Sequence, residues 1–266
     1  MKHLNLVLAC LLAVCVLLPA TAGAGTLNEI LDRGTLRVGM EPGYMPFEMT
    51  NTKGDIIGFD VDVAKRMAKA MGVELELVNT AWDGIIPSLV TKKFDIIMSG
   101  MTLTQERNLK VNFANPYVVV GQSILIRKEI ADEVKSYRDL NKEEYKVASK
   151  LGTTGEQATN RMIPKATYIS FETEQEGMMD LINGKVDAFV YDLPYMVVQN
   201  AQRNDGSLVF LDEPFTYEPI AWAIRPGNHD FLNWLNNFMN QIKSDGTYDK
   251  LYSKWFKSNA WLRQIQ

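Results

Sequence analysis

The stretch Gly58-Phe-Asp-Val-Asp-Val63, with the helical run that follows it to Met71, decides the fold of this 266-residue chain. Apolar residues recur through this run at the spacing of one helix face. The next segment, Glu74-Leu-Glu-Leu-Val78, instead alternates with period two, as a half-buried strand does. Strands that alternate with helices in this way predict sheets rich in parallel strands and covered by helices.

A repeat predicts two lobes. The segment Leu89-Val-Thr-Lys-Lys-Phe-Asp95-Ile-Ile-Met-Ser-Gly100 aligns without gaps with Leu181-Ile-Asn-Gly-Lys-Val-Asp187-Ala-Phe-Val-Tyr-Asp192. Each copy reads as a helix end, a tight turn, an aspartate and a buried strand. A comparable first strand precedes each copy, at residues 36–40 and 145–149.

Residues 1–24 have the pattern of a secretory signal peptide. Lys2 gives a basic start, residues 4–18 are apolar except for one asparagine, and small residues near Ala22 offer a cleavage site. Both cysteines, Cys10 and Cys15, lie in this leader, so we expect a mature chain without thiols or disulfides. An uncleaved membrane anchor is the alternative.

Charge narrows the choice of partners. Without Lys2 the chain has 27 basic and 32 acidic residues, a net charge of −5. A mildly acidic surface argues against nucleic acid or an anionic membrane as partner. We therefore expect a soluble globular protein whose partner is neither nucleic acid nor an anionic membrane.

Three motifs together resemble a known family. They are the Gly58 run, Met98-Ser-Gly-Met-Thr-Leu-Thr-Gln-Glu-Arg107, and Gly152-Thr-Thr-Gly-Glu156. With them the chain is similar, from about Leu27 to Phe256, to the bacterial extracytoplasmic solute-binding proteins, family 3. These proteins deliver amino acids to ABC importers. The resemblance implies a monomeric periplasmic protein without a cofactor, whose partners are a free L-amino acid and a permease with its ATPase.

The resemblance also implies an α/β fold of the two-lobed, type II periplasmic-binding-protein kind, with two mixed sheets, flanking helices and two hinge strands. Lobe 1 would comprise residues 27–118 and 220–266, and lobe 2 residues 119–219. The β-prone runs 118–126 and 220–224 would cross between the lobes. Two crossings would permit the lobes to close around a ligand.

Ligands of open α/β sheets bind outside the carboxyl ends of the strands. This rule selects the residues after Met40, the segments 99–102 and 150–154, and Asp192, with the aromatic loop 79–82 beside them. A guanidinium and backbone N–H groups suit the carboxylate of an amino acid, and a carboxylate suits its ammonium group. Arg107 and Asp192 could supply these two charges.

The predicted ligand-binding residues fall into two groups under the resemblance. One group would bind the α-carboxylate and α-ammonium of the ligand: Ser99, Gly100, Thr102, Arg107, Thr154 and Asp192. The other would meet the ligand's side chain: Glu41, Tyr44, Trp82 and Lys150. We add Thr153 because it belongs to the same loop, and we expect no metal ligand and no catalytic residue.

Several of these residues also have a purely structural explanation. Arg107 could pair with Glu106, Asp192 could cap a helix, and the segment Thr153-Thr154 could do the same. Tyr44 and Trp82 could be core aromatics. Asp60 and Asp62 are interpreted as a helix cap and a surface residue, and they are left out of the predicted site.

The sequence favours a binding protein over an enzyme. His3 and His229 are the only histidines, and no phosphate loop or dinucleotide fingerprint is present. Periplasmic cyclohexadienyl dehydratases are similar to this family, however, and use a general-acid glutamate near the position of Glu156. An enzyme of that kind, and a sensor domain, are the alternative functions.

The predicted pocket leaves two candidate ligands. Glu41 and Lys150 together could hold the neutral amide of glutamine. If Lys150 turned away, Glu41 with Tyr44 and Trp82 would instead hold the cationic side chain of arginine or lysine. Acidic and aliphatic side chains fit neither arrangement.

Overall fold

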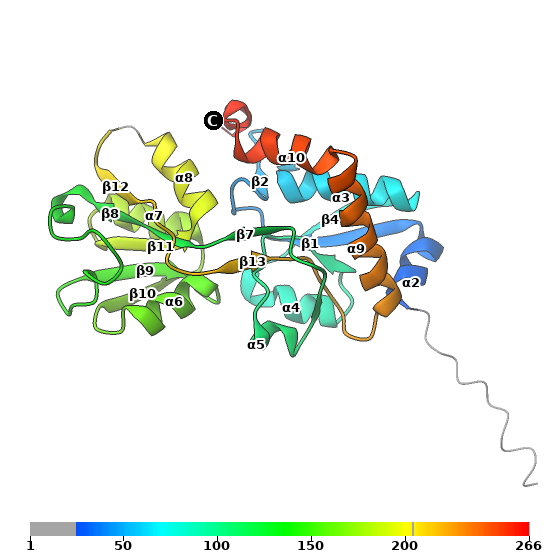
Figure 1. The fold of residues 1–266 in the computed structure, drawn as a ribbon, viewed down its shortest axis with the longest axis horizontal. Helices are drawn as coiled ribbons and strands as arrows, with labels where there is room; N and C mark the ends of the chain where they lie inside the picture. The colour runs from blue at the N-terminus through cyan, green and yellow to red at the C-terminus, as the bar shows by residue number, and fades with distance from the viewer. Residues whose placement is uncertain (1–24, 204, 266) are drawn as a thin grey trace, which may run out of the picture.

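The computed structural model describes residues 25–203 and 205–265; the predicted signal peptide, residues 1–24, lies outside them. The chain forms two α/β lobes that lie side by side and are joined by paired strands (Figure 1). Among the described residues, no helix has both the length and the apolar character that crossing a membrane requires.

The first lobe is built on a mixed sheet. Within the described chain its strand order is β4 (Glu74–Asn79), β1 (Thr35–Met40), β5 (Ile96–Ile97), β14 (Ala223–Ile224) and β6 (Asn112–Phe113). Strands β4, β1 and β5 run parallel, whereas β14 is antiparallel to both β5 and β6. The predicted first strand and the predicted alternating strand are therefore neighbours in this sheet.

Helices cover both faces of the first sheet, with α3 (Phe59–Met71) above it and α4 (Trp82–Val90) below it in Figure 1. The apolar face of α3 is buried, and the helix ends at Gly72, whose φ of 71° is the left-handed conformation that glycine tolerates. The remaining elements of this lobe are α2 (Thr26–Arg33), β2 (Met49–Thr50), β3 (Ile56–Ile57), α5 (Gln105–Asn108), α9 (His229–Ser244), α10 (Thr247–Phe256) and the 3-10 helix η3 (Ala260–Gln264).

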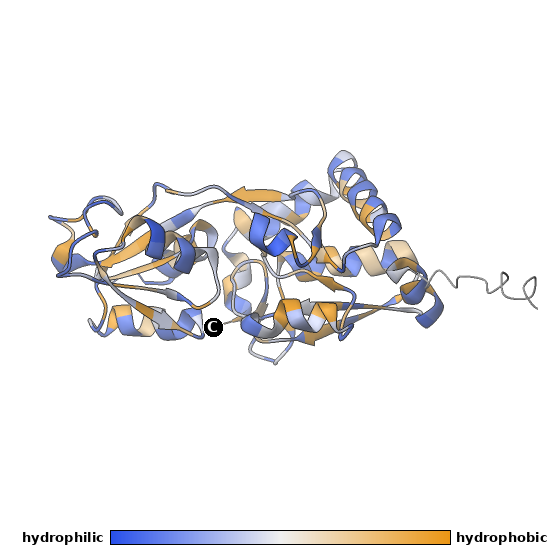
Figure 2. Cartoon of the chain, turned by 90° about the horizontal axis from the view of Figure 1, so that it is seen from below, coloured by the Kyte–Doolittle hydropathy of each residue, from blue (hydrophilic) through white to orange (hydrophobic). Residues whose placement is uncertain are grey.

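The second lobe repeats this plan. Its sheet has the order β10 (Thr167–Phe171), β9 (Lys146–Lys150), β11 (Ala188–Asp192), β8 (Gln122–Arg127) and β12 (Leu208–Leu211). Its helices are α6 (Thr154–Met162), α7 (Glu174–Ile182), α8 (Leu193–Gln202) and the 3-10 helix η2 (Lys128–Ile130). Colouring by hydropathy shows apolar strands inside both lobes, and polar colour over much of the surrounding helices (Figure 2).

Asp95 and Asp187 explain the sequence repeat. In the first lobe, Asp95 Oδ2 accepts a hydrogen bond of 2.9 Å from the backbone N–H of Arg37 at the start of the sheet. In the second lobe, Asp187 Oδ2 accepts one of 2.8 Å from the backbone N–H of Lys146. Each aspartate also pairs with a guanidinium group, Arg37 at 3.0 Å in the first lobe and Arg127 in the second. The repeated aspartate therefore fastens the first strand of each lobe to the strand that the aspartate precedes.

Two short antiparallel strands, β7 (Val118–Val120) and β13 (Glu218–Ile220), connect the lobes. Gly121 separates β7 from β8, and a Cβ at this position would lie 2.5 Å from the carbonyl oxygen of Thr216. The first predicted crossing is thus divided at Gly121, and the second falls at 218–220 rather than at 220–224. We propose that the lobes divide within these strands, with residues 27–118 and 220–266 in lobe 1 and 119–219 in lobe 2.

Candidate ligand-binding site

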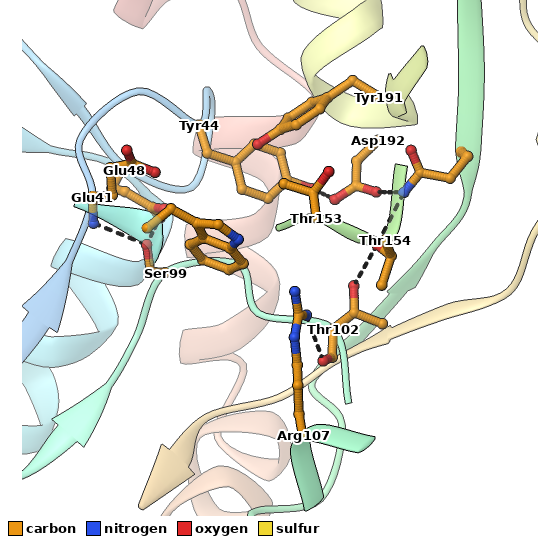
Figure 3. A pocket seen from close by; sticks show the side chains of 13 residues that line it. Glu41, Tyr44, Glu48, Ser99, Thr102, Arg107, Thr153, Thr154, Tyr191 and Asp192 are labelled. Atoms are coloured by element: carbon orange, nitrogen blue, oxygen red, sulfur yellow. Dashed lines mark hydrogen bonds between the residues drawn. The ribbon is translucent and has the colours of Figure 1, made fainter. Parts of the chain in front are cut away.

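A pocket lies between the lobes, at the carboxyl ends of β1, β5, β9 and β11 (Figure 3). Every predicted ligand-binding residue except Lys150 lines it. Three further residues line it as well: Glu48, Gln122 and Tyr191. The first lobe contributes the residues from Glu41 to Arg107, and the second lobe those from Gln122 to Asp192.

Arg107 presents a buried cation to the pocket. The Thr104 hydroxyl caps the short helix α5 by accepting from the Arg107 N–H, at 3.1 Å, which fixes the start of the side chain. The guanidinium donates to the carbonyl oxygens of Thr102 and Gly152, at 3.0 and 3.1 Å, and lies 5.2 Å from the ring centre of Trp82. No ion pair of Arg107 occurs among the described residues. A guanidinium has five N–H donors, so it retains donors for a ligand carboxylate.

Asp192 presents a buried anion on the opposite side. It stands at the N-cap position of α8, but its side chain makes no capping hydrogen bond. One carboxylate oxygen accepts from the Tyr44 hydroxyl at 2.5 Å, and the other accepts from the amide of Gln122. Burial raises the pKa of Asp192 to about 7, although both hydrogen bonds act to lower it. An entering ammonium group would stabilise the ionised carboxylate.

Between Arg107 and Asp192, threonine hydroxyl groups of the two lobes come close to one another. Thr102 Oγ1 lies 3.4 Å from Thr154 Oγ1, and the Gln122 amide donates to Thr154 Oγ1 at 3.2 Å. Thr153 caps α6 by accepting from the Glu156 N–H, and it lines the pocket as well. The structural explanation of Thr153 is thus correct without excluding contact with a ligand.

Gly100 brings its backbone close to the ring of Tyr44. Its φ is 54°, in the left-handed region, and a Cβ would lie 2.2 Å from Cε1 of Tyr44. Only glycine accommodates both the backbone conformation and the tyrosine ring. The Tyr44 ring in turn meets the Tyr191 ring edge to face, with centres 5.4 Å apart, so aromatic packing continues from one lobe into the other.

The interpretation of Asp60 as a helix cap is wrong. Asp60 is completely buried, and its Oδ2 accepts from the Gly100 N–H at 3.0 Å and from the Tyr117 hydroxyl at 2.9 Å. Asp60 therefore supports the pocket floor from behind. Asp62 binds the indole N–H of Trp255 at 2.9 Å and the ammonium of Lys254 at 2.6 Å, which fastens α3 to α10.

Carboxylates gather at the end of the pocket that Glu41 and Glu48 line, which we call the far end. Ser99 Oγ accepts from the Glu41 N–H at 3.0 Å and donates to Glu48 Oε1 at 2.8 Å. Glu48 is completely buried. Burial raises the pKa of Glu41 and, more strongly, that of Glu48.

Lys150 lies behind this cluster, not in the pocket lining. Its ammonium is bound between Glu174 of the same lobe, at 2.8 Å, and Glu41 of the other lobe. Burial acts to lower the pKa of Lys150, but the two carboxylates outweigh burial and raise it. Lys150 therefore neutralises carboxylates and spans the two lobes, and the predicted arrangement in which it faces the ligand opposite Glu41 is not seen.

Sequence reasoning missed three lining residues, and each had only a weak signal. Glu48 is a single carboxylate in the apolar run Met45-Pro-Phe-Glu-Met49, which is a sign of burial. Tyr191 directly precedes Asp192, and Gln122 directly follows the lobe connection. Glu48 bonds Ser99, 51 positions away, and Gln122 bonds Asp192, 70 positions away. The ring of Tyr191 packs against that of Tyr44 in the other lobe.

A profile described as "Bacterial extracellular solute-binding proteins, family 3" matches residues 36–258. The chain belongs to this family. As its description states, the members of family 3 are extracellular proteins that bind solutes. The type II periplasmic-binding-protein fold predicted from the sequence is confirmed.

Curated relatives within family 3 bind different amino acids. The L-cystine-binding protein TcyJ of Escherichia coli K12 is 31% identical over 239 residues, which cover 90% of this chain and 89% of TcyJ. The ABC transporter arginine-binding protein 1 of the same strain is 32% identical over 255 residues, 95% and 98% of the two chains. The family alone therefore leaves the ligand open.

Two solved structures are more similar in sequence. A binding component of an ABC transporter from Wolinella succinogenes DSM 1740, complexed with lysine, is 56% identical with a TM-score of 0.84. The ancestral amino acid-binding protein AncCDT-1, a precursor of cyclohexadienyl dehydratase, is 50% identical with a TM-score of 0.82. Each comparison covers 87% of this chain and 99% of the other.

Proposed function

We propose that this family 3 protein is the periplasmic binding component of an amino-acid ABC importer and that its ligand is a basic amino acid, lysine or arginine. The observation that carries the proposal is the excess of carboxylates at the far end of the pocket. Glu41, Glu48 and Glu174 meet there, with Lys150 as the single cation among the described residues of the cluster. A cationic ligand side chain would offset this excess.

The opposite end of the pocket, with Arg107 and Asp192, suits the α-carboxylate and α-ammonium groups that all amino acids share. Arg107 would bind the α-carboxylate, and Asp192 would bind the α-ammonium. These charges come from different lobes, so a ligand that contacts both is held only when the lobes are closed. Rotation about β7 and β13 would supply this closure, and the closed protein would present its ligand to the permease and its ATPase.

A basic side chain fits the far end better than the amide of glutamine does. The glutamine arrangement needs the Lys150 ammonium to donate to the amide oxygen, but this ammonium is already bound by Glu41 and Glu174. The faces of Trp82 and Tyr44 would add favourable contacts to a cation. The lysine complex of the Wolinella protein supports the same choice, as does an AncCDT-1 structure described as a cationic amino acid solute-binding protein.

The dehydratase alternative has less support. Glu156, the residue considered as a general acid, accepts a hydrogen bond of 2.6 Å from the Gly152 N–H and does not line the pocket. Its carboxylate thus stabilises the loop that leads into α6. The similarity to AncCDT-1 is a similarity to an amino-acid-binding ancestor.

Calorimetry on protein that has been unfolded, stripped of ligand and refolded tests the proposal. The panel comprises lysine, arginine, ornithine, histidine, glutamine, cystine, glutamate, leucine and prephenate. We expect lysine or arginine to bind most tightly. Tight binding of glutamine, with the basic amino acids silent, would restore the amide arrangement, and turnover of prephenate would favour the enzyme.

A further inference from the structure

Glu48 is a buried carboxylate with half of its hydrogen-bonding capacity unused. Its side chain is completely inaccessible to solvent, and it lines the pocket. Oε1 accepts from the Ser99 hydroxyl, whereas Oε2 has no hydrogen-bond partner. Leaving a buried acceptor without a partner costs free energy, and more so when the group is charged.

No cation within the described residues pairs with Glu48. The titratable groups that act on it are the carboxylates of Asp60, Glu174 and Glu41 and the hydroxyls of Tyr44 and Tyr117. Burial raises the pKa of Glu48 well above its usual range, and the charge of Asp60 raises it further. The Ser99 hydrogen bond opposes both effects. The neutral acid is therefore favoured while the surroundings stay as they are.

A structural role accounts for only one of the two oxygens. Holding the Ser99 hydroxyl requires a single acceptor, and the side-chain oxygen of a glutamine would serve equally well. Ser99 in turn receives the Glu41 N–H, so this chain orients the loop that contains Glu41. The second oxygen, Oε2, takes no part in this row of hydrogen bonds, although Glu48 lines the pocket.

We propose that Glu48 and Glu41 together bind the cationic group of the ligand side chain, and that Glu48 gives up its proton as the cation enters. This inference rests on the proposed binding of a basic amino acid. The O–H bond of the Glu48 carboxylic acid breaks, the electron pair stays on the carboxylate, and the proton passes to the solvent. The ligand cation then supplies the partner that Oε2 lacks.

The coupling has a definite sign. A proton and the ligand cation compete for the same carboxylate, so affinity for a basic amino acid increases with pH until Glu48 is ionised in the free protein as well. Below that point, one coupled proton increases affinity by up to about tenfold per pH unit. The Glu48→Gln variant lacks this contribution.

Calorimetry of lysine and arginine binding at pH 7 in phosphate and in Tris measures the protons released, since the two buffers differ in ionisation enthalpy. Asp192 also titrates near neutral pH and faces the α-ammonium, so the quantity of interest is the difference between wild type and Glu48→Gln. We expect Glu48→Gln to release fewer protons, by up to about one, and to bind lysine at least tenfold more weakly at pH 8. Glu76→Gln, on the exposed side of β4, is the matched control and should behave as wild type.

Carbon NMR of the glutamate carboxyl groups provides a direct readout. The Glu48 signal is identified by its absence from the Glu48→Gln spectrum, and it should move from the position of an acid to that of a carboxylate when lysine is added. If lysine binds wild type tightly but the proton count equals that of Glu48→Gln and the signal does not move, the role of Glu48 is refuted while the proposed function stands. If neither lysine nor arginine binds wild type, both fail.

Discussion

The hydroxyl of Tyr44 donates a hydrogen bond of 2.5 Å to Oδ2 of Asp192, across the boundary between the lobes. The two residues are 148 positions apart in sequence. Asp192 is also the carboxylate proposed to bind the α-ammonium of the ligand. One side chain therefore takes part both in the contact between the lobes and in the recognition of the ligand.

The Asp192→Asn variant should lose most of its affinity for any amino acid. The variant keeps the shape of the side chain but leaves the α-ammonium without its anionic partner in a desolvated site. Such losses are about 2–5 kcal/mol, roughly thirtyfold to several thousandfold in Kd. Tyr44→Phe removes only one of the hydrogen bonds between the lobes and should cost less. Binding by Asp192→Asn within threefold of wild type, measured by calorimetry on folded protein, would refute the assignment.

Replacement of Arg107 should be equally damaging at the other end of the ligand. Arg107→Ala removes the cation, and Arg107→Lys keeps the charge but loses the planar pair of donors that matches a carboxylate. We expect the alanine variant to weaken binding by about 2–5 kcal/mol and the lysine variant to fall between it and wild type. Lys110→Ala, an exposed neighbour outside the pocket, should be unchanged. Equal affinities for all four proteins would remove Arg107 from the site.

Ligand should make the protein more compact. Contacts to Arg107 and Asp192 from a single ligand exist only with the lobes together, so binding shifts the population toward the closed form. Small-angle scattering with saturating lysine or arginine should give a smaller radius of gyration than scattering without it. An unchanged radius alongside binding proven by calorimetry would exclude hinge closure.

Stability of the ligand-free protein should decrease as pH rises. Burial raises the pKa of Asp192, and that of Asp60, from 3.8 to about 7. A carboxyl group whose pKa is raised by folding stabilises the folded state below pH 4, and this contribution is lost as pH rises through about 7. Between pH 5 and 8 the Tm of Asp192→Asn should therefore fall less than that of wild type. Parallel curves for the two proteins would show that Asp192 does not titrate in this range.

Two glycine substitutions should have opposite effects on stability. Gly121→Ala places a Cβ 2.5 Å from the Thr216 carbonyl oxygen between the connecting chains, and it should destabilise the fold by about 1–3 kcal/mol. Gly84→Ala, inside α4, meets nothing within 4 Å and should stabilise the fold by roughly 0.5–1 kcal/mol. Denaturant titrations measure both effects. If Gly121→Ala is as stable as wild type, the connecting strands are less constrained than their packing indicates.

The layout of the fold was predictable because it rests on local patterns. Helix and strand periodicities placed most elements, and the repeat around Asp95 and Asp187 revealed the two lobes. The rule that ligands bind at the carboxyl ends of strands then located the pocket before any contact was known.

The parts that were missed depend on contacts between distant segments. Asp60 follows a helix-start pattern, but Gly100 and Tyr117 determine its environment. Lys150 stands at a strand end, as predicted, yet its long side chain reaches Glu174, which nothing near position 150 could indicate. Glu48 has only its apolar neighbours as a sign of burial, and nothing in the sequence places it at the pocket. Periodicity specifies which face a residue occupies, whereas the neighbour across that face is a property of the assembled chain.

The strand order of the first sheet sets the sequence in which the lobes can be completed. Strand β14 lies between β5 and β6, although the chain reaches it only after every strand of the second sheet. A chain that emerges from its N-terminus can therefore finish the lobe it began second, while the lobe it began first still lacks a central strand. Since domains fold as units, a nascent chain that ends before Ala223 should contain one formed lobe and one that lacks the strand between β5 and β6. The lobe that contains the first strands of the chain is thus the last to be completed.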